Sequence, residues 1–96
     1  MDIKITGTDE IVISGNIKNV TDYQEVKRVM TEMLRGNCGE ITVRMPDSIS
    51  ITSSVIGYFL KLVYQDNIKL NLIVAESLFN LLSDLRLTEA FNAIKE

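Results

Sequence analysis

The stretch SISITSSVIG, residues 48–57, concentrates serine and threonine hydroxyls directly before an apolar run. A serine hydroxyl becomes a nucleophile only beside a base that takes its proton, and the chain contains no histidine to do so. Lysine is the remaining candidate base, but the spacing of Lys61 and Lys69 brings neither toward the hydroxyls. We therefore expect these hydroxyls to serve a purpose other than hydrolysis, and we expect the protein not to be an enzyme.

Other kinds of chemical site find little support in the residue types. Zinc and other soft metals need clustered cysteine and histidine, whereas Cys38 is the one cysteine in the chain. The glycines form neither a dinucleotide fingerprint nor a P-loop. Neighbouring carboxylates such as Asp9 and Glu10 are typical of a turn, and Cys38 is expected to be a plain loop residue. The sequence predicts no metal site and no cofactor.

Charge and hydropathy narrow the class of partner. The net charge is −3, and lysine and arginine are scattered along the chain, so no basic stripe for nucleic acid is present. The run VIGYFLKLVY is interrupted by Lys61 and is shorter than the roughly 20 residues of a membrane span. The first residues lack the apolar run of a signal peptide. We expect a cytoplasmic protein that binds neither nucleic acid nor membrane and contacts other proteins.

Periodicity predicts the first half of the fold. Alternating residues at 3–5 and 11–13, separated by Gly7-Thr8-Asp9, indicate two strands in a hairpin. Thr21 and Gln24 have the spacing of a capping box before a helix at about 22–35, which Gly36 ends. The runs EITVRM and KLNLIV predict two further strands.

Three further helices are expected after the third strand. Apolar residues recur at helical spacing from Val55 to Val63 and from Leu78 to Leu85. Thr88 is expected to cap a last short helix that carries Phe91 and Ile94. The order β-β-α-β-α-β-α-α predicts an α/β fold with a four-stranded mixed sheet, in one domain over residues 1–96.

This order places the hydroxyl-rich stretch at the carboxyl end of a parallel strand, where α/β sheets present their sites. Thr52, Ser53 or Ser54 could each cap the following helix by accepting a hydrogen bond from a free backbone N–H group. A hydroxyl in the first turn of a helix is also a favourable phosphate acceptor, because the positive end of the helix dipole stabilises the added negative charge.

The segment ITSSVIGYFL is similar to the I-D-S-S-G-L-G-x-x-L signature of STAS domains, the bacterial anti-sigma-factor antagonist family. VISGNI resembles that family's G-x-(L/I) segment, and TDYQEVKRVM and KLNLIV resemble its first helix and fourth strand. LLSDLRLTEAF resembles its closing L-x-x-x-G-L-x-x-x-F pattern. The chain departs from the signature at four positions, with Thr52 and Arg44 in place of aspartate, and Val55 and Arg86 in place of glycine.

The resemblance implies a regulatory domain that works by partner switching in transcription control. It implies phosphorylation at Ser54, with Ser53 as the second candidate, and partner contacts by Thr52, Ser53, Ser54, Val55 and Tyr58. The expected partner is an anti-sigma factor that is also a serine kinase of the histidine-kinase-like ATPase type, together with a serine phosphatase. The alternative, favoured by the changes at Thr52 and Val55, is a STAS-like scaffold or ligand sensor without phosphorylation.

Overall fold

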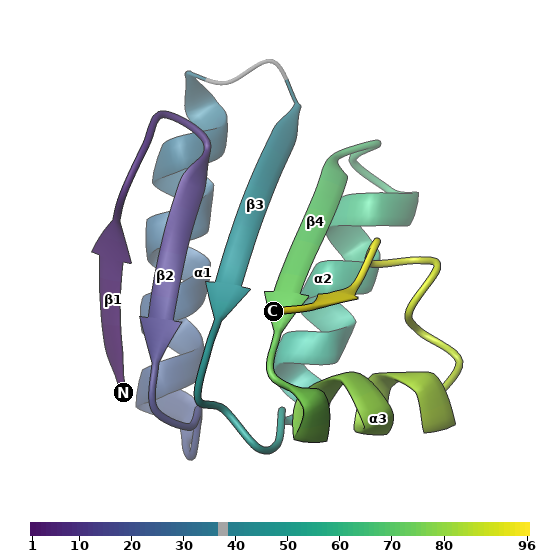
Figure 1. Ribbon diagram of the computed structural model, residues 1–96. Helices are drawn as coiled ribbons and strands as arrows, with labels where there is room; N and C mark the ends of the chain where they lie inside the picture. Colours follow the sequence, from purple (N-terminus) through teal and green to yellow (C-terminus); the bar gives the residue numbers. More distant parts are fainter. Residues whose placement is uncertain (37–38) are drawn as a thin grey trace.

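A five-stranded sheet, with its strands in the order β1-β2-β3-β4-β5, forms the centre of the protein (Figure 1). The computed structural model describes residues 1–36 and 39–96, so the prediction for Cys38 lies outside the described residues. Helices α1 and α2 lie behind the sheet in this view, and α3 follows β4 at the end of the sheet. The predicted α/β class is confirmed.

The strands pair as a mixed sheet. β1 (Asp2–Ile5) and β2 (Glu10–Ser14) form the predicted antiparallel hairpin. β3 (Glu40–Met45) and β4 (Lys69–Val74) run parallel to β2 and to each other, as expected for strands that are joined through helices. The carboxyl ends of β2, β3 and β4 therefore meet at one edge of the sheet, which we call the carboxyl edge.

The prediction of a four-stranded sheet and a last helix is wrong. Residues 88–92 form turns, and β5 (Ile94–Lys95) adds a fifth strand parallel to β4. Asn92 ends the turn with a positive φ of 46°, and its side-chain amide donates to the Leu70 carbonyl at 3.1 Å. The Leu72 N–H group donates to the Phe91 carbonyl at 3.1 Å. These bonds hold the segment against β4, so a helix does not continue.

The three helices are α1 (Val20–Arg35), α2 (Ser53–Tyr64) and α3 (Glu76–Asp84). The capping box predicted at Thr21 is wrong, because Thr21 lies inside α1. Asn19 is the N-cap, and its Oδ1 accepts from the Asp22 N–H group at 2.9 Å. The Asp22 carboxylate in turn accepts from the Lys18 N–H group at 3.0 Å.

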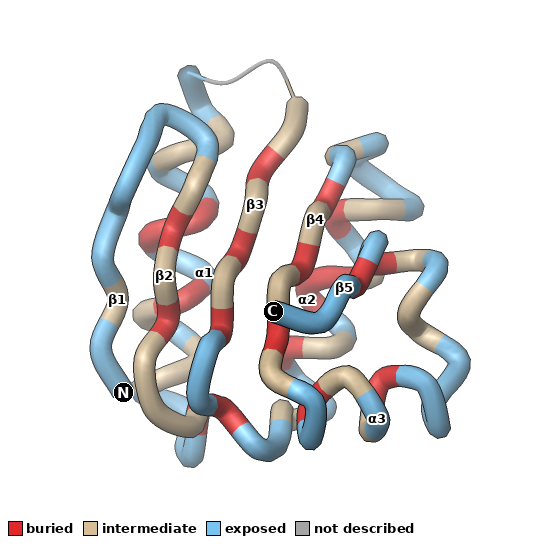
Figure 2. Tube along the Cα trace, in the orientation of Figure 1, coloured by how far each residue is buried: buried red, intermediate tan, exposed pale blue. Residues whose placement is uncertain are grey.

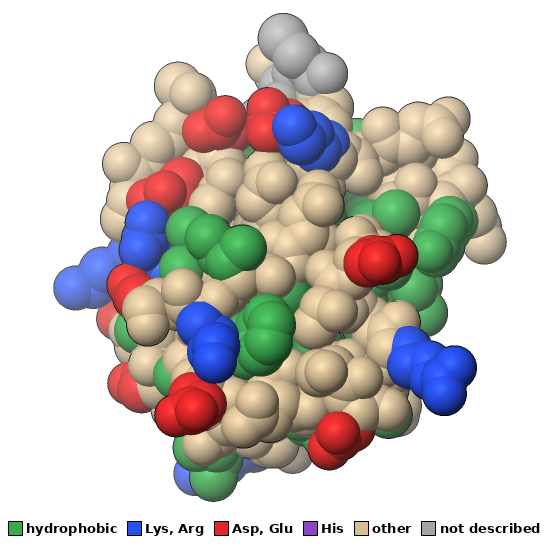
Figure 3. All heavy atoms as spheres, turned by 45° about the vertical axis from the view of Figure 1, so that its right-hand side comes forward, with side chains coloured by type: hydrophobic (Ala, Val, Ile, Leu, Met, Phe, Trp, Pro, Cys, Tyr) green, Lys and Arg blue, Asp and Glu red, His purple; other side chains and the backbone are tan. Residues whose placement is uncertain are grey.

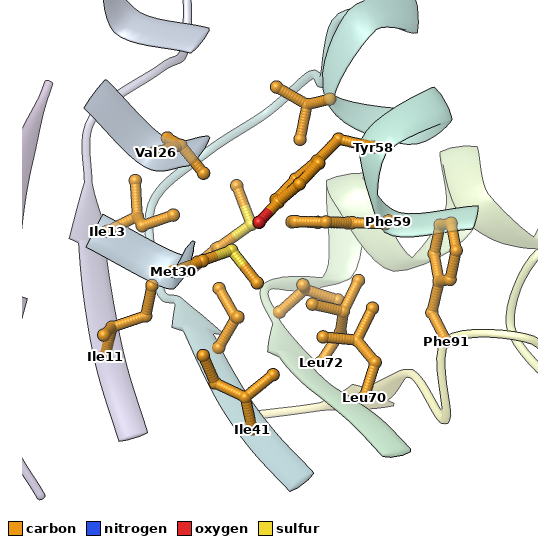
Figure 4. Close-up of a cluster of buried hydrophobic side chains, with 14 of the residues drawn as sticks. Ile11, Ile13, Val26, Met30, Ile41, Tyr58, Phe59, Leu70, Leu72 and Phe91 are labelled. Carbon is orange, nitrogen blue, oxygen red and sulfur yellow. The ribbon is translucent and has the colours of Figure 1, made fainter. Parts of the chain in front are cut away.

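The core lies between the sheet and its helices (Figure 2). Alternate residues of β2, β3 and β4 face the helices and are buried, as a period of two requires; these are Ile11, Ile13, Ile41, Val43, Met45, Leu70, Leu72 and Val74. Figure 4 shows Tyr58 and Phe59 reaching into this layer from α2, and Phe91 packs edge-on against Phe59 with 5.7 Å between ring centroids.

The opposite face of the sheet carries polar and charged side chains. Arg44 on β3 lies 2.9 Å from Glu96 and 3.8 Å from Glu10. Figure 3 shows acidic and basic side chains intermixed, with small hydrophobic groups between them. Within residues 1–36 and 39–96, no helix combines the length and the hydrophobicity that crossing a bilayer requires.

Candidate functional site at the carboxyl edge

Two loops at the carboxyl edge are joined by hydrogen bonds. Residues 15–19 connect β2 to α1, and residues 46–52 connect β3 to α2. The Gly15 N–H group donates to the Asp47 carboxylate at 2.7 Å, and the Ser48 hydroxyl donates to the Gly15 carbonyl at 2.7 Å. The Ile49 N–H group donates to the Asn16 side chain at 2.9 Å. Ser48 is fully buried, so this hydroxyl holds the loops together.

Thr52 caps α2. Its Oγ1 accepts from the Val55 N–H group at 3.3 Å, and its carbonyl accepts from the Ile56 N–H group at 3.1 Å. Of the three residues that could cap this helix, Thr52 is therefore the one that does so. The hydroxyls of Ser53 and Ser54 take no part in this cap.

Ser53 and Ser54 form the exposed first turn of α2. Neither hydroxyl forms a hydrogen bond with any residue that the structure describes. Ser54 and Thr52 line a depression of about 220 Å³, whose other side is formed by residues at or just before the start of α1: Lys18, Asn19, Val20 and Tyr23. Ser53 does not line this depression, so the structure distinguishes the two serines.

Exposed hydrophobic side chains lie on the same edge. Val20, at the start of α1, is 68% exposed, and Ile49, in the loop before α2, is 65% exposed. Both belong to the two joined loops and the helix starts that follow them. We call Lys18, Val20, Ile49, Ser53 and Ser54 the hydroxyl surface. It combines free hydroxyls and a cation with two large exposed apolar side chains.

Two residues expected to contact a partner lie in the core. Val55 is fully buried and Tyr58 is 6% exposed, with the Tyr58 ring pointing from α2 toward α1 (Figure 4). The Tyr58 hydroxyl lies 3.3 Å from the Thr31 hydroxyl of α1, and burial raises the pKa of this phenol. Of the five residues expected to contact a partner, Ser53 and Ser54 are exposed and Thr52 is partly exposed, whereas the side chains of Val55 and Tyr58 are buried.

The two remaining departures from the signature have different surroundings. Arg44 faces the open side of the sheet, where it pairs with Glu10 and Glu96, and it is not part of the hydroxyl surface. Arg86 follows α3 and has a positive φ of 59°, a conformation that glycine adopts at much lower cost. Gly15, in the segment VISGNI, also has a positive φ, of 80°.

Lys61 and Lys69, the two lysines considered as bases for the serines, form ion pairs with acidic residues outside the hydroxyl surface. The Lys61 ammonium lies 3.2 Å from the Asp66 carboxylate after the last turn of α2, and Lys69 lies 3.8 Å from Glu40. Across the described part of the chain, no three histidine, cysteine, aspartate or glutamate residues come together in a group that could hold a metal ion.

Sequence reasoning missed Lys18, Val20 and Tyr23 as neighbours of Ser54. They precede Ser54 by 31 residues or more, so no local pattern connects them. The signal that could have found them is the parallel pairing of β2 and β3, because it places the starts of α1 and α2 at the same edge of the sheet.

Comparisons of the chain with protein-family models, with curated proteins and with solved structures found no match.

Proposed function

We propose that this protein is a STAS-like regulatory domain that binds a protein partner through the hydroxyl surface and is released from it when Ser54 is phosphorylated. The observation that carries the proposal is the free, exposed Ser54 hydroxyl in the first turn of α2, beside exposed hydrophobic side chains. A domain of this kind is the switched component of a regulatory pathway and not a catalyst.

Backbone conformation supports the resemblance on which the proposal partly rests. The STAS signature has glycine where this chain has Arg86, and Arg86 has the left-handed backbone that favours glycine. The glycine of the G-x-(L/I) segment corresponds to Gly15, which is also left-handed. Arg86 therefore has a backbone conformation that suits the glycine of the signature.

Phosphate at Ser54 would change the hydroxyl surface in two ways. It would add a charge of about −1.5 to −2 at the positive end of the α2 dipole, where such a charge is tolerated by the folded protein. It would also place a strongly hydrated dianion beside Val20, inside a contact that depends on apolar burial. The domain would remain folded while the complex dissociates.

Ser54 is a better acceptor candidate than Ser53, because only Ser54 shares a depression with Lys18. The Lys18 ammonium can approach a phosphate there and partly neutralise it. The resemblance supplies the class of partner: an anti-sigma factor with serine kinase activity, and a serine phosphatase that resets the switch in the bacterial cytoplasm.

The test is intact mass with site mapping, on protein purified from its native cells and again after incubation with the candidate kinase and ATP. We expect a gain of about 80 Da, the mass of one phosphate, at Ser54. The variants Ser54→Ala and Ser53→Ala are a matched pair, since both remove an exposed hydroxyl from the same turn. Loss of the modification in Ser53→Ala but not in Ser54→Ala would move the site to Ser53, and no modification under either condition would refute the switch.

A scaffold without phosphorylation is the second candidate. It is favoured by Thr52, whose side chain has no carboxylate to orient an acceptor hydroxyl and whose own hydroxyl is used as the cap. Ser54→Asp separates the two functions when partner binding is measured by calorimetry. The switch predicts at least a tenfold loss of affinity in this variant, whereas the scaffold predicts binding equal to that of Ser54→Ala.

A further inference from the structure

A second recess lies between α1 and α2, in the halves of these helices that point away from the carboxyl edge. It has a volume of about 400 Å³, within the usual range for small-molecule sites. We call it the interhelix cleft. Its lining comes from α1, from α2 and from the turn before β4: Lys27, Thr31, Leu34, Arg35, Tyr58, Lys61, Leu62, Asp66 and Ile68.

Apolar side chains and two hydroxyls form the inner surface of the interhelix cleft. Leu62 and Tyr58 are nearly fully buried, and Leu34 and Ile68 pack against the core beside them. The hydroxyls of Thr31 and Tyr58 lie 3.3 Å apart, and one of them donates to the other. Because each hydroxyl carries one proton, the accepting hydroxyl keeps its own proton for a ligand.

The charged side chains of the cleft carry a positive surplus. Lys27, Arg35 and Lys61 line it with Asp66 as the one carboxylate in the lining, so the lining has a surplus of two positive charges in a chain whose net charge is −3. Asp66 lies 3.2 Å from Lys61, and Arg35 lies 3.4 Å from Glu32, which lies outside the lining. Counting Glu32, one positive charge still remains.

Lys27 supplies that remaining charge. Its ammonium forms no ion pair with any carboxylate among the described residues, and it lies 6.0 Å from the centre of the Tyr58 ring. This separation is at the outer limit of a cation–π contact. The ammonium thus lies over the Tyr58 ring and lines the same cleft as the two hydroxyls, without a carboxylate partner in the part of the chain that the structure describes.

We propose that the interhelix cleft binds a small monocarboxylate with an aromatic or alkyl body. Its carboxylate is held by the Lys27 ammonium and by the free hydroxyl proton of the pair that Thr31 and Tyr58 form, and its body lies on Leu34 and Leu62. A single negative charge matches the single unpaired cation, which favours a carboxylate over a phosphate dianion. The proposal is independent of the switch at Ser54, because the two sites share no residue.

The test is an amide NMR titration of the full chain with 3-phenylpropionate and, separately, with the uncharged 3-phenylpropanamide. The carboxylate should produce saturable shifts at Lys27, Thr31 and Tyr58, with a dissociation constant of about 1 mM, as expected for a ligand of this size. The amide should bind at least about threefold more weakly, because it has the same body but no charge.

Two lysine variants complete the experiment. Lys27→Gln should weaken binding of the carboxylate about three- to fivefold and leave binding of the amide unchanged. Lys4→Gln is the matched control, since Lys4 is an exposed lysine on β1 and should leave both affinities unchanged. Equal affinities for carboxylate and amide, an unaffected Lys27→Gln, or no saturable shift at these residues up to about 20 mM would each overturn the proposal.

Discussion

At the residue scale, two neighbouring hydroxyl residues at the start of α2 have different roles. Thr52 accepts a hydrogen bond from the Val55 N–H group, whereas Ser53, one residue later, is exposed and lies inside the helix. We predict that Thr52→Ala lowers the free energy of unfolding by about 1 kcal/mol, because one N–H group loses its partner. Ser53→Ala should change it by less than about 0.5 kcal/mol. Urea unfolding measures both, and equal losses would contradict the assignment of the cap.

A second pair of variants tests the start of α1. Asn19→Ala should cost about 1 kcal/mol, because Asn19 Oδ1 accepts from the Asp22 N–H group. Thr21→Ala should be nearly neutral, since Thr21 is an exposed residue inside α1. Thermal or urea unfolding of the two variants gives the comparison, and a larger loss in Thr21→Ala would restore the capping box predicted from the sequence.

The N-cap of α1 is Asn19 and not the predicted Thr21, which shows a limit of prediction from local residue spacing. Thr21 followed by Gln24 has the same spacing as Asn19 followed by Asp22, and both pairs have suitable side chains. Local spacing therefore fits two helix starts, and Val20 between them is apolar in the sequence but exposed in the structure, so it does not show where the buried face of α1 begins. The bond from Ser48 to Gly15 joins residues 33 apart, so it depends on the paired strands and has no local pattern at all.

At the scale of the elements, β5 depends on Asn92. Asn92→Gly loses the side-chain bond to the Leu70 carbonyl but keeps the favourable backbone, whereas Asn92→Ala loses both. We expect Asn92→Ala to be less stable than Asn92→Gly by about 1 kcal/mol, the cost of a left-handed residue with a Cβ atom. Urea unfolding measures the difference.

Amide exchange then reports on β5 itself. The Leu72 N–H group, which donates to Phe91, and the Glu96 N–H group, which donates to Val74, should exchange faster in Asn92→Ala. Amides in the middle of α1, whose hydrogen bonds lie within that helix, serve as the internal control. Unchanged protection of Leu72 would show that Asn92 does not hold this segment.

The hydrophobic periodicity of the sequence predicts the longer elements, but it does not predict the last strand, β5. Strong period-two and helical patterns over residues 40–45 and 55–63 correspond to β3 and α2, since each buries one face over several residues. β5 contains only two residues, so alternation cannot reveal it, and Phe91 and Ile94 have a spacing that also fits a helix. The hydrogen bonds to β4 determine that this segment ends in a strand and not in a helix.

At the scale of the whole molecule, Tyr58 links stability to pH. Burial raises the pKa of Tyr58 above its ordinary value of 10.0, so the folded chain keeps a proton that the unfolded chain releases. This contribution is fully present below pH 10 and is lost as the pH rises above that value. The free energy of unfolding should therefore fall less between about pH 9 and about pH 11 in Tyr58→Phe than in the wild type.

The control for this pH series is Tyr64→Phe, which changes a tyrosine that is 68% exposed. Its curve should run parallel to that of the wild type. Tyr58→Phe starts about 1 kcal/mol lower near neutral pH, because the bond to Thr31 is lost, and approaches the wild type at high pH. Parallel curves for all three proteins would show that Tyr58 makes no such contribution.

The order of the strands also determines how the molecule responds to mechanical force. β1 and β5 are the two opposite edges of the sheet, and the chain ends lie at them (Figure 1). Tension between residues 1 and 96 acts across the strands, along the bonds that join them, so these bonds are loaded a few at a time instead of together. β5, paired with β4 over two residues, yields first. A stretched molecule therefore unzips from its edges in small steps at low force, and the long β3–β4 pair opens late.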